Sequence, residues 1–179
     1  MLFTLYINDL PSGTNFSNVI MYTDETVIFF SSAQLMEVEL KLNMELTSLS
    51  EWLCGNKLLL NLKKTKFIFF GMQQRLCRQG IEGIDIALGG ESVKHCDAIK
   101  YLGVILDSSL SMNQHIDHVK KKVSKMLGIF SWARPSLTIE SANRLFKSMI
   151  LPILGYCGAV FHRCGKGNKE GLECLQLVE

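Results

Sequence analysis

The fold is organised around residues 19–30, which read VIMYTDETVIFF. Two runs of β-branched and aromatic residues flank a short acidic centre, and this pattern predicts a β-hairpin with Asp24 and Glu25 at or near its tip. The centre lacks the Asn-Gly or Asp-Gly pair that is typical of a tight two-residue turn. Two adjacent carboxylates on a rigid hairpin form an oxygen-rich corner of the kind that Mg²⁺ prefers. The alternative is a polar turn that only keeps the hairpin soluble.

A long amphipathic helix is predicted after the hairpin. We expect it over about residues 33–53, with Ser31 and Ser32 able to cap its free N–H groups. Its apolar residues recur at helical spacing and should face the core, whereas Glu45 lies mostly outside their stripe. The stripe comprises Leu35, Val38, Leu42, Leu46, Leu49 and Leu53. A shorter apolar helix is expected over residues 1–10.

Short strands are predicted after the long helix. The apolar runs cover residues 58–60, 66–70, 84–88, 91–93 and 99–106. Gly89 and Gly90 separate two of these runs, and a Gly-Gly pair is typical of a tight hairpin turn. The last run predicts one strand with Gly103 in its interior, where glycine permits a bulge or a close approach of the backbone.

From residue 111 the apolar spacing becomes helical. A first helix ends near Pro135, and one face carries an apolar stripe while another carries lysines. The stripe comprises Ile116, Val119, Val123, Met126 and Phe130. Further helices are predicted over residues 138–151 and 153–161 and from residue 173. In the first of these, Leu145, Phe146 and Met149 should point inward.

The complete pattern predicts the α+β class, with an α+β lobe over residues 1–107 and an all-helical lobe over residues 108–179. A hydrophobic content of 47% and a charged content of 20% are typical of a folded protein and exclude a disordered one. The net charge of +2 indicates no particular partner. The apolar stretch at residues 149–161 is interrupted by proline and glycine and is too short to span a bilayer, so we expect no membrane contact.

The six cysteines contain no Cys-x-x-Cys pair, and no secretory signal precedes them. We therefore expect reduced thiols in a cytoplasmic or nuclear protein that is not secreted. The alternative is a zinc cluster of Cys157, His162, Cys164 and Cys174, but their spacing matches no common zinc module.

Five segments resemble reverse transcriptases of non-LTR (LINE-type) retrotransposons, and they occur in the family's order. LFTLYINDLP at residues 2–11 resembles the segment before motif C, and residues 19–30 resemble motif C itself. Residues 52–71, with Lys64 and Thr65, resemble motif D. KYLGV at residues 100–104 resembles motif E, and the lysine-rich helix after it is similar to the thumb. These segments cover nearly the whole chain.

The resemblance implies a partial polymerase palm of antiparallel hairpins with a long packing helix, over residues 1–107. A helical thumb and the start of a connection region, cut short, would follow over residues 108–179. It also implies catalysis with two Mg²⁺ ions held by carboxylates. Asp24 matches the first aspartate of motif C, and Glu25 stands where the second would be, with a side chain longer by one methylene.

Other residues receive roles from the same resemblance. Lys64 matches the motif D lysine, which could protonate the pyrophosphate leaving group or neutralise triphosphate charge, although Lys63 or Lys66 could replace it. The primer grip would comprise Tyr101, Leu102 and Gly103. The phosphate-binding face would comprise Lys120, Lys121, Lys122 and Lys125, which could equally be a solvated helix face. The implied partners of the intact parent are an RNA template, a DNA primer and deoxynucleoside triphosphates.

Motifs A and B of the family would precede Met1, so residues 1–179 lack the upstream polymerase segment and its aspartate. We therefore expect this chain by itself not to polymerise. One alternative is a remnant that binds nucleic acid without catalysis. Another is an unrelated α+β scaffold whose acidic hairpin is a plain turn.

Overall fold

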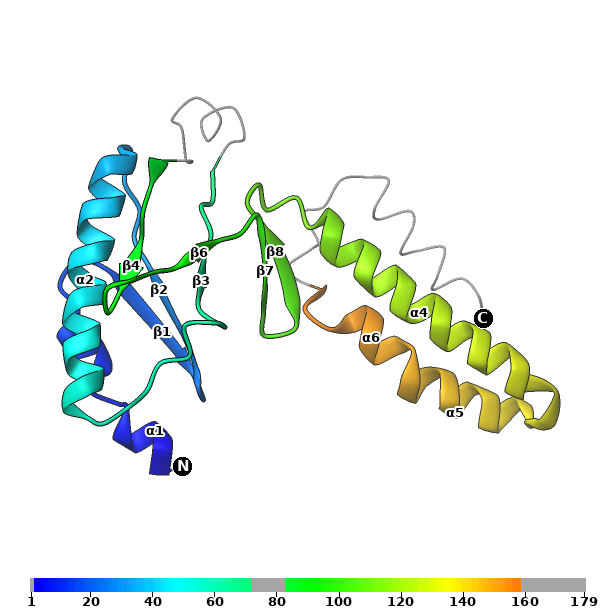
Figure 1. Cartoon of the computed structure of the whole chain (residues 1–179). Coiled ribbons are helices and arrows are strands. Elements are labelled where there is room, and N and C mark those ends of the chain that lie inside the picture. Colours follow the sequence, from blue (N-terminus) through cyan, green and yellow to red (C-terminus); the bar gives the residue numbers. More distant parts are fainter. Residues whose placement is uncertain (1, 72–82, 159–179) are drawn as a thin grey trace. The chain divides into compact units, whose positions relative to one another are not determined.

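The computed structural model describes residues 2–71 and 83–158. The chain forms two compact units, Met1–Cys96 and Asp97–Glu179 (Figure 1). Helices and small two-stranded sheets are mixed along the chain, in agreement with the predicted α+β class. The boundary between the two compact units lies between Cys96 and Asp97. The expected division into palm and thumb, after residue 107, stays a prediction.

The acidic hairpin forms as predicted. Strands β1 (Asn18–Tyr22) and β2 (Glu25–Phe29) are antiparallel, and Tyr22 pairs with Glu25. Thr23 and Asp24 are therefore the two residues of the turn. Thr23 has φ of 54°, the left-handed region that tight hairpin turns require, even though its side chain is β-branched. Asp24 lies at the tip, and Glu25 is the first residue of β2.

The long helix α2 (Leu35–Gly55) begins two residues later than predicted. Its N-cap is Gln34, which makes no side-chain capping bond, so the predicted serine cap is wrong. The Ser32 hydroxyl instead accepts a hydrogen bond from the Gln34 backbone N–H at 3.2 Å and donates one to Glu37. Before the hairpin, the predicted first helix is a short α1 (Leu2–Tyr6) followed by a 3₁₀ turn, η1 (Leu10–Gly13).

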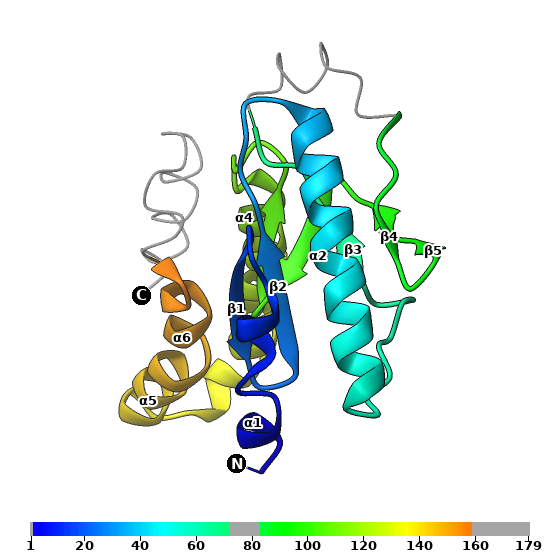
Figure 2. The same ribbon diagram turned by 90° about the vertical axis from the view of Figure 1, so that its left-hand side faces the viewer.

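The core of the first unit lies between α2 and a second hairpin. That hairpin pairs β4 (Ala87–Leu88) with β5 (Glu91–Ser92) around Gly89 and Gly90, both at positive φ, as predicted. Its buried residues are Ile86, Leu88 and Val93, and the residues packed on them include Leu42, Leu46, Leu62 and Phe67. Figure 2 shows α2 running alongside β4. A parallel pair of β3 (Lys66–Phe67) and β6 (Lys94–His95) completes the unit's sheets.

Two predicted strands of the first unit differ from the structure. Residues 58–60 form no strand, because the Leu58 N–H bonds to the Leu53 carbonyl at the end of α2 and the Leu59 side chain is fully exposed. The run at residues 66–70 contains only the two-residue strand β3. Both runs are apolar enough for a strand, but only β3 finds a neighbour to pair with.

The second unit begins with a hairpin where one continuous strand was predicted. Strands β7 (Ala98–Tyr101) and β8 (Val104–Asp107) are antiparallel, and Leu102 and Gly103 form the turn between them. Their φ values are 45° and 82°. Two successive residues in the left-handed region reverse the chain, which is why Gly103 lies in a turn and not inside a strand.

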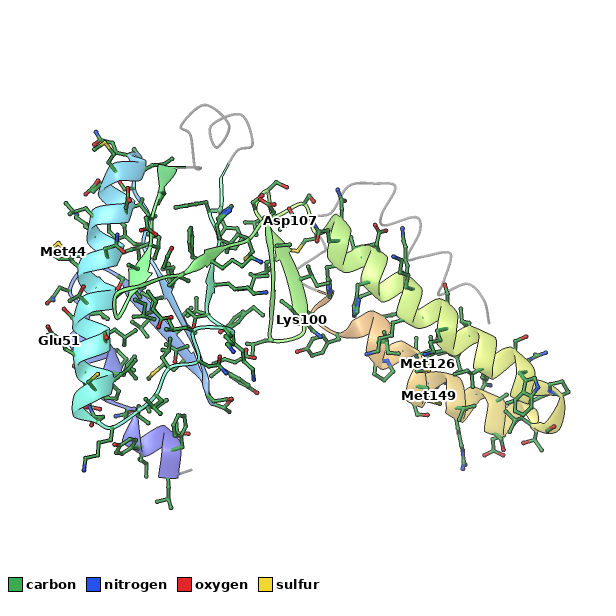
Figure 3. All side chains as sticks on the ribbon, in the orientation of Figure 1. Met44, Glu51, Lys100, Asp107, Met126 and Met149 are labelled. Atoms are coloured by element: carbon green, nitrogen blue, oxygen red, sulfur yellow. The ribbon has the colours of Figure 1, made fainter. Side chains whose placement is uncertain are left out.

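Asp107 organises the loop that joins β8 to α4 (Asn113–Ala133) (Figure 3). Its buried carboxylate accepts hydrogen bonds from the backbone N–H groups of Ser109, Ser111 and Met112. The hydroxyl groups of both serines also donate to it, at 2.6 and 3.1 Å. One carboxylate thus satisfies three backbone N–H groups and two hydroxyl groups of the loop that leads into this helix.

The helices of the second unit pack around a shared apolar core. Helix α4 contacts η3 (Arg134–Ser136) and α6 (Leu151–Gly155), and α5 (Ile139–Met149) contacts α6. The buried residues are Val119, Val123, Phe146, Ile150 and Leu154, and the residues packed on them include Met126 and Phe130. The predicted stripe of α4 is confirmed. The inward placement of Met149 is wrong, since its side chain is 42% exposed.

Parts of several predictions lie outside the described residues. These are residues 159–161 of the helix expected over residues 153–161, the helix expected from residue 173, and three of the four zinc-cluster candidates, His162, Cys164 and Cys174. Within the described residues, that helix is wrong in its bounds, since α6 begins at Leu151 and ends at Gly155. Among the described helices, none combines the length and apolar content that a bilayer span needs.

Candidate functional site

Asp24 presents an ionised carboxylate at the exposed tip of the first hairpin. The Thr23 hydroxyl donates a hydrogen bond to its Oδ1 at 2.9 Å. This bond, a backbone N–H and the positive charge of Lys64 together hold the pKa of Asp24 below its usual value. The carboxylate is therefore ready to act as an anionic ligand at neutral pH.

Lys64 is brought within electrostatic range of Asp24 by the fold of the first unit. It lies in a turn in which the Asn61 carbonyl accepts hydrogen bonds from the N–H groups of Lys64 and Thr65, both at 3.0 Å. The Asn61 side chain also accepts from the Lys64 N–H at 3.3 Å. Local hydrogen bonds thus fix the backbone of the lysine, while its exposed side chain faces solvent.

The donor set at the hairpin tip fits a hard cation in part. Asp24 and Glu25 are adjacent and exposed, and carboxylate oxygens are the ligands that Mg²⁺ prefers. Within residues 2–71 and 83–158, no three histidine, cysteine, aspartate or glutamate side chains gather into a metal site. Mg²⁺ is commonly held by one or two carboxylates together with substrate phosphates, so the two carboxylates at the tip would supply only part of such a site.

The turn of the β7–β8 hairpin is held by a residue that the sequence did not indicate. The Tyr156 hydroxyl, beyond the end of α6, donates a hydrogen bond to the Leu102 carbonyl oxygen at 2.7 Å. A Cβ atom added to Gly103 would lie 3.2 Å from the Tyr156 ring. The three primer-grip candidates, Tyr101, Leu102 and Gly103, therefore sit at one braced turn of the second unit.

The candidate phosphate-binding lysines of α4 do not share one environment. Lys121, Lys122 and Lys125 are exposed, whereas Lys120 is half-buried. No carboxylate of the described residues forms an ion pair with the three exposed lysines. Helical spacing of three and four places Lys122, Lys125 and Trp132 on one side of α4, and the Trp132 side chain is 85% exposed. This side of the helix is therefore basic along its middle and aromatic at its end.

Comparisons with known proteins find similarity to polymerases of mobile elements. The "RNA-directed DNA polymerase from mobile element jockey" of Drosophila melanogaster is 23% identical over 185 residues, which cover 98% of this chain and 20% of that protein. The jockey polymerase of Drosophila funebris is 22% identical over the same shares. The chain is a relative of non-LTR retrotransposon reverse transcriptases. The predicted resemblance to this family is thus confirmed, whereas the assignment of segments to motifs C, D and E stays a prediction.

The similarity covers only part of each of these reverse transcriptases. The "Retrovirus-related Pol polyprotein from type-1 retrotransposable element R1 4" of Nasonia vitripennis is 26% identical over 106 residues, which cover 55% of this chain and 26% of that protein. The chain spans about a fifth of the length of the jockey reverse transcriptases that it matches. No family model matches the sequence. No solved structure matches it either.

Proposed function

We propose that this chain is the part of a non-LTR reverse transcriptase that extends from motif C through the thumb. Residues 1–107 would form part of the palm and residues 108–179 the thumb. The observation that carries the proposal is the similarity to jockey polymerases over 98% of the chain, together with an ionised Asp24 at a hairpin tip within range of Lys64.

In the proposed parent enzyme, Asp24 and Glu25 would hold Mg²⁺ beside the growing DNA strand. Bound Mg²⁺ supplies activation of a 3′-hydroxyl and neutralises the charge of a leaving pyrophosphate. The Thr23 hydroxyl donates a hydrogen bond to the Asp24 carboxylate, which lowers its pKa further and favours one orientation. Lys64 brings a cation to the same end of the unit, where it can neutralise triphosphate charge or donate a proton to the leaving group.

Residues 1–179 are proposed not to polymerise alone. Two Mg²⁺ ions need carboxylates that bridge them, and these residues contain no counterpart of the motif A aspartate. Glu25 also extends its carboxylate about one ångström further than an aspartate would, while functional sites tolerate about 0.5 Å of misplacement. The missing carboxylate would have to come from a further polymerase segment.

The second unit is proposed to contact the nucleic acid. The exposed Lys121, Lys122 and Lys125 would bind phosphates of a primer and template. Lys120 is half-buried and would contribute less to this binding. The turn braced by Tyr156 would support the primer end. A second candidate function, nucleic-acid binding without catalysis, is favoured by the same exposed lysines and by the adjacent Trp132, whose ring offers a stacking surface for a base.

Metal binding at Asp24 separates the two candidates. We expect Mn²⁺, as a paramagnetic probe for Mg²⁺, to broaden the NMR signals of amides 22–26 in the unsubstituted chain. Asp24→Asn should remove this broadening, while Glu91→Gln, on exposed β5, should leave it unchanged. Broadening of comparable strength in the Asp24→Asn variant would contradict the metal site. Unchanged RNA affinity of that variant, without any metal effect, would favour the binding remnant.

A further inference from the structure

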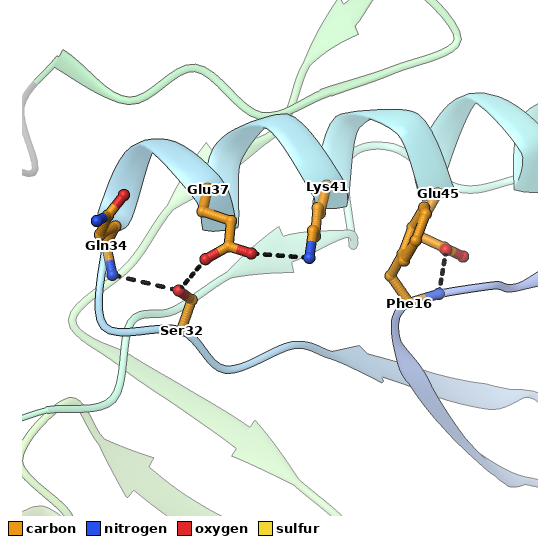
Figure 4. Close-up of polar contacts among 6 residues, drawn as sticks. All are labelled: Phe16, Ser32, Gln34, Glu37, Lys41 and Glu45. Atoms are coloured by element: carbon orange, nitrogen blue, oxygen red, sulfur yellow. Dashed lines mark hydrogen bonds and ion pairs between the residues drawn. The ribbon is translucent and has the colours of Figure 1, made fainter.

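Helix α2 contacts the base of the acidic hairpin through two side chains one helical turn apart, Lys41 and Glu45. Figure 4 shows the hydrogen bond from the Phe16 N–H to Glu45 and the ion pair of Lys41 with Glu37. Residues spaced by four lie on the same side of a helix, so the two side chains act from one face of α2. Glu45 contacts the segment just before β1, and Lys41 contacts residues before β1 and after β2.

Glu45 fixes the entry to β1. Its side chain is 2% exposed, and its Oε1 accepts hydrogen bonds from the backbone N–H groups of Asn15 at 2.7 Å and Phe16 at 2.6 Å. The other carboxyl oxygen is buried and has no hydrogen-bond partner among the described residues. Burying such a group costs free energy, so an apolar side chain would serve packing alone better. Glu45 instead orients the backbone, because its two hydrogen bonds hold Asn15 and Phe16 in place just before β1.

Lys41 contacts the residue that lies before β1 and the residue that lies after β2, both at the base of the hairpin. Its Nζ lies 5.2 Å from the ring centroid of Phe16 and 5.1 Å from that of Phe30. These distances are within the range of cation–π attraction. Glu37 holds the ammonium from its other side at 2.7 Å and accepts a hydrogen bond from Ser32. Phe16, which precedes β1, and Phe30, which follows β2, thus both lie against the same ammonium group.

We propose that Lys41 and Glu45 are positioning residues for the Asp24 carboxylate. This inference rests on the proposed function of the hairpin tip. A five-residue strand is about 17 Å long, so a tilt of about 5° at its base moves the tip by about 1.5 Å. That displacement is about three times what a metal site tolerates, since the tolerance is about 0.5 Å. Holding the base of the hairpin on α2 therefore determines whether Asp24 can bind metal and stay close to Lys64.

Four variants of the full chain test the proposal, with Mn²⁺ broadening at amides 22–26 as the readout. Lys41→Met removes the cation and keeps the stem, whereas Lys41→Arg keeps the cation. Glu45→Leu removes the acceptor, whereas Glu45→Gln keeps one acceptor oxygen. We expect the Met and Leu variants to weaken Mn²⁺ binding about tenfold, as loss of a supporting contact typically does. The Arg and Gln variants should restore most of the affinity. Glu51→Gln, on the exposed outer side of α2 (Figure 3), is the matched control.

Unchanged Mn²⁺ affinity in both Lys41→Met and Glu45→Leu would overturn the proposal, and so would an equal loss in Glu51→Gln. If Glu45→Leu does not fold, the comparison of Lys41→Met with Lys41→Arg decides. If the unsubstituted chain binds no Mn²⁺, the proposed function fails. Residual dipolar couplings then test separately whether Lys41 and Glu45 hold the orientation of the hairpin. The orientation of amides 18–29 relative to α2 should change in Lys41→Met and return in Lys41→Arg. If the hairpin has the same orientation in all variants, Lys41 and Glu45 do not position it, whatever the result of the metal experiment.

Discussion

The Tyr156 hydroxyl donates a 2.7 Å hydrogen bond to the Leu102 carbonyl oxygen, which lies 54 residues earlier in the chain. Leu102 is at the turn of the β7–β8 hairpin, and its φ of 45° is in the left-handed region. The Tyr156 ring also covers the space beside Gly103. The turn proposed as a primer grip is thus braced by the residue that directly follows α6, and its shape depends on the helices of the same unit.

Gly103→Ala should destabilise the second unit by about 1–3 kcal/mol, because its φ of 82° is strained for alanine and the new methyl group would meet the Tyr156 ring. Gly128→Ala is the control. It lies in α4 with open space around the added carbon, so it should stabilise by about 0.5–1 kcal/mol. Urea unfolding of both variants measures the difference. Equal effects of the two substitutions would argue against the braced turn.

Asp107→Asn should destabilise the second unit by about 2–3 kcal/mol, because an amide cannot replace a carboxylate that accepts five hydrogen bonds. Asp117→Asn, on the exposed side of α4, should have little effect. Thermal unfolding of both variants at pH 7 is the measurement. A small loss for Asp107→Asn would mean that the loop keeps its shape without the charge.

The pKa of Asp107 predicts how stability depends on acid. Burial raises this pKa, but the hydrogen bonds from Ser109, Ser111 and Met112 outweigh burial, so the pKa lies below its usual value near 3.8. Its contribution is therefore complete above about pH 4 and is lost as the pH falls through the lower folded value. Unfolding free energies from pH 5 to pH 2 should show this loss in the unsubstituted chain. The Asp107→Asn variant should lose less over the same range.

His115 should make the second unit less stable in mild acid. Its side chain is 2% exposed, and its Nδ1 accepts a hydrogen bond from the Ile105 N–H at 3.3 Å. Burial and the neighbouring His118 lower the pKa of His115 below its usual value of 6.5, so folding favours the neutral ring. Stability should therefore fall as the pH drops below about 6.5, because the unfolded chain binds the proton first. His115→Asn, which keeps an acceptor near Nδ1, should lose this dependence in melting curves from pH 7 to pH 5. If the variant shows the same dependence of melting temperature on pH, another group causes that dependence.

Replacing Lys121, Lys122 and Lys125 with glutamine should weaken binding of single-stranded RNA and flatten its salt dependence. Each lysine that neutralises a phosphate contributes about 0.7 to the slope of log K against log salt, so the slope should fall by about 2. Replacement of Lys57 and Lys94, in the first unit, is the control. Trp132→Ala should reduce affinity without changing the slope, because stacking releases no counterions. Salt titrations by filter binding measure both quantities, and an unchanged slope in the triple variant would exclude this face of α4.

Elements with local signals were predictable before any tertiary contact was known. Runs of β-branched and aromatic residues on either side of Asp24 predicted the first hairpin, and Gly89 with Gly90 predicted the turn of the second. Helical spacing predicted α2 and the buried stripe of α4. These features follow from residue type, from the helical period of 3.6 residues and from the backbone freedom of glycine, and none of these depends on distant parts of the chain. The order of the motifs also sufficed to indicate the polymerase family.

The tertiary structure decided which residues meet. Nothing local in the sequence indicated that Glu45, assigned to the polar side of α2, is buried against the entry to β1. The bond from Tyr156 to Leu102 and the charge of Lys64 near Asp24 likewise depend on how elements pack. Residues 58–60 and 66–70 had the composition of strands, but pairing needs a neighbour in space. Periodicity fixes which face of an element is apolar, and packing alone fixes which polar groups lie within hydrogen-bonding and electrostatic reach.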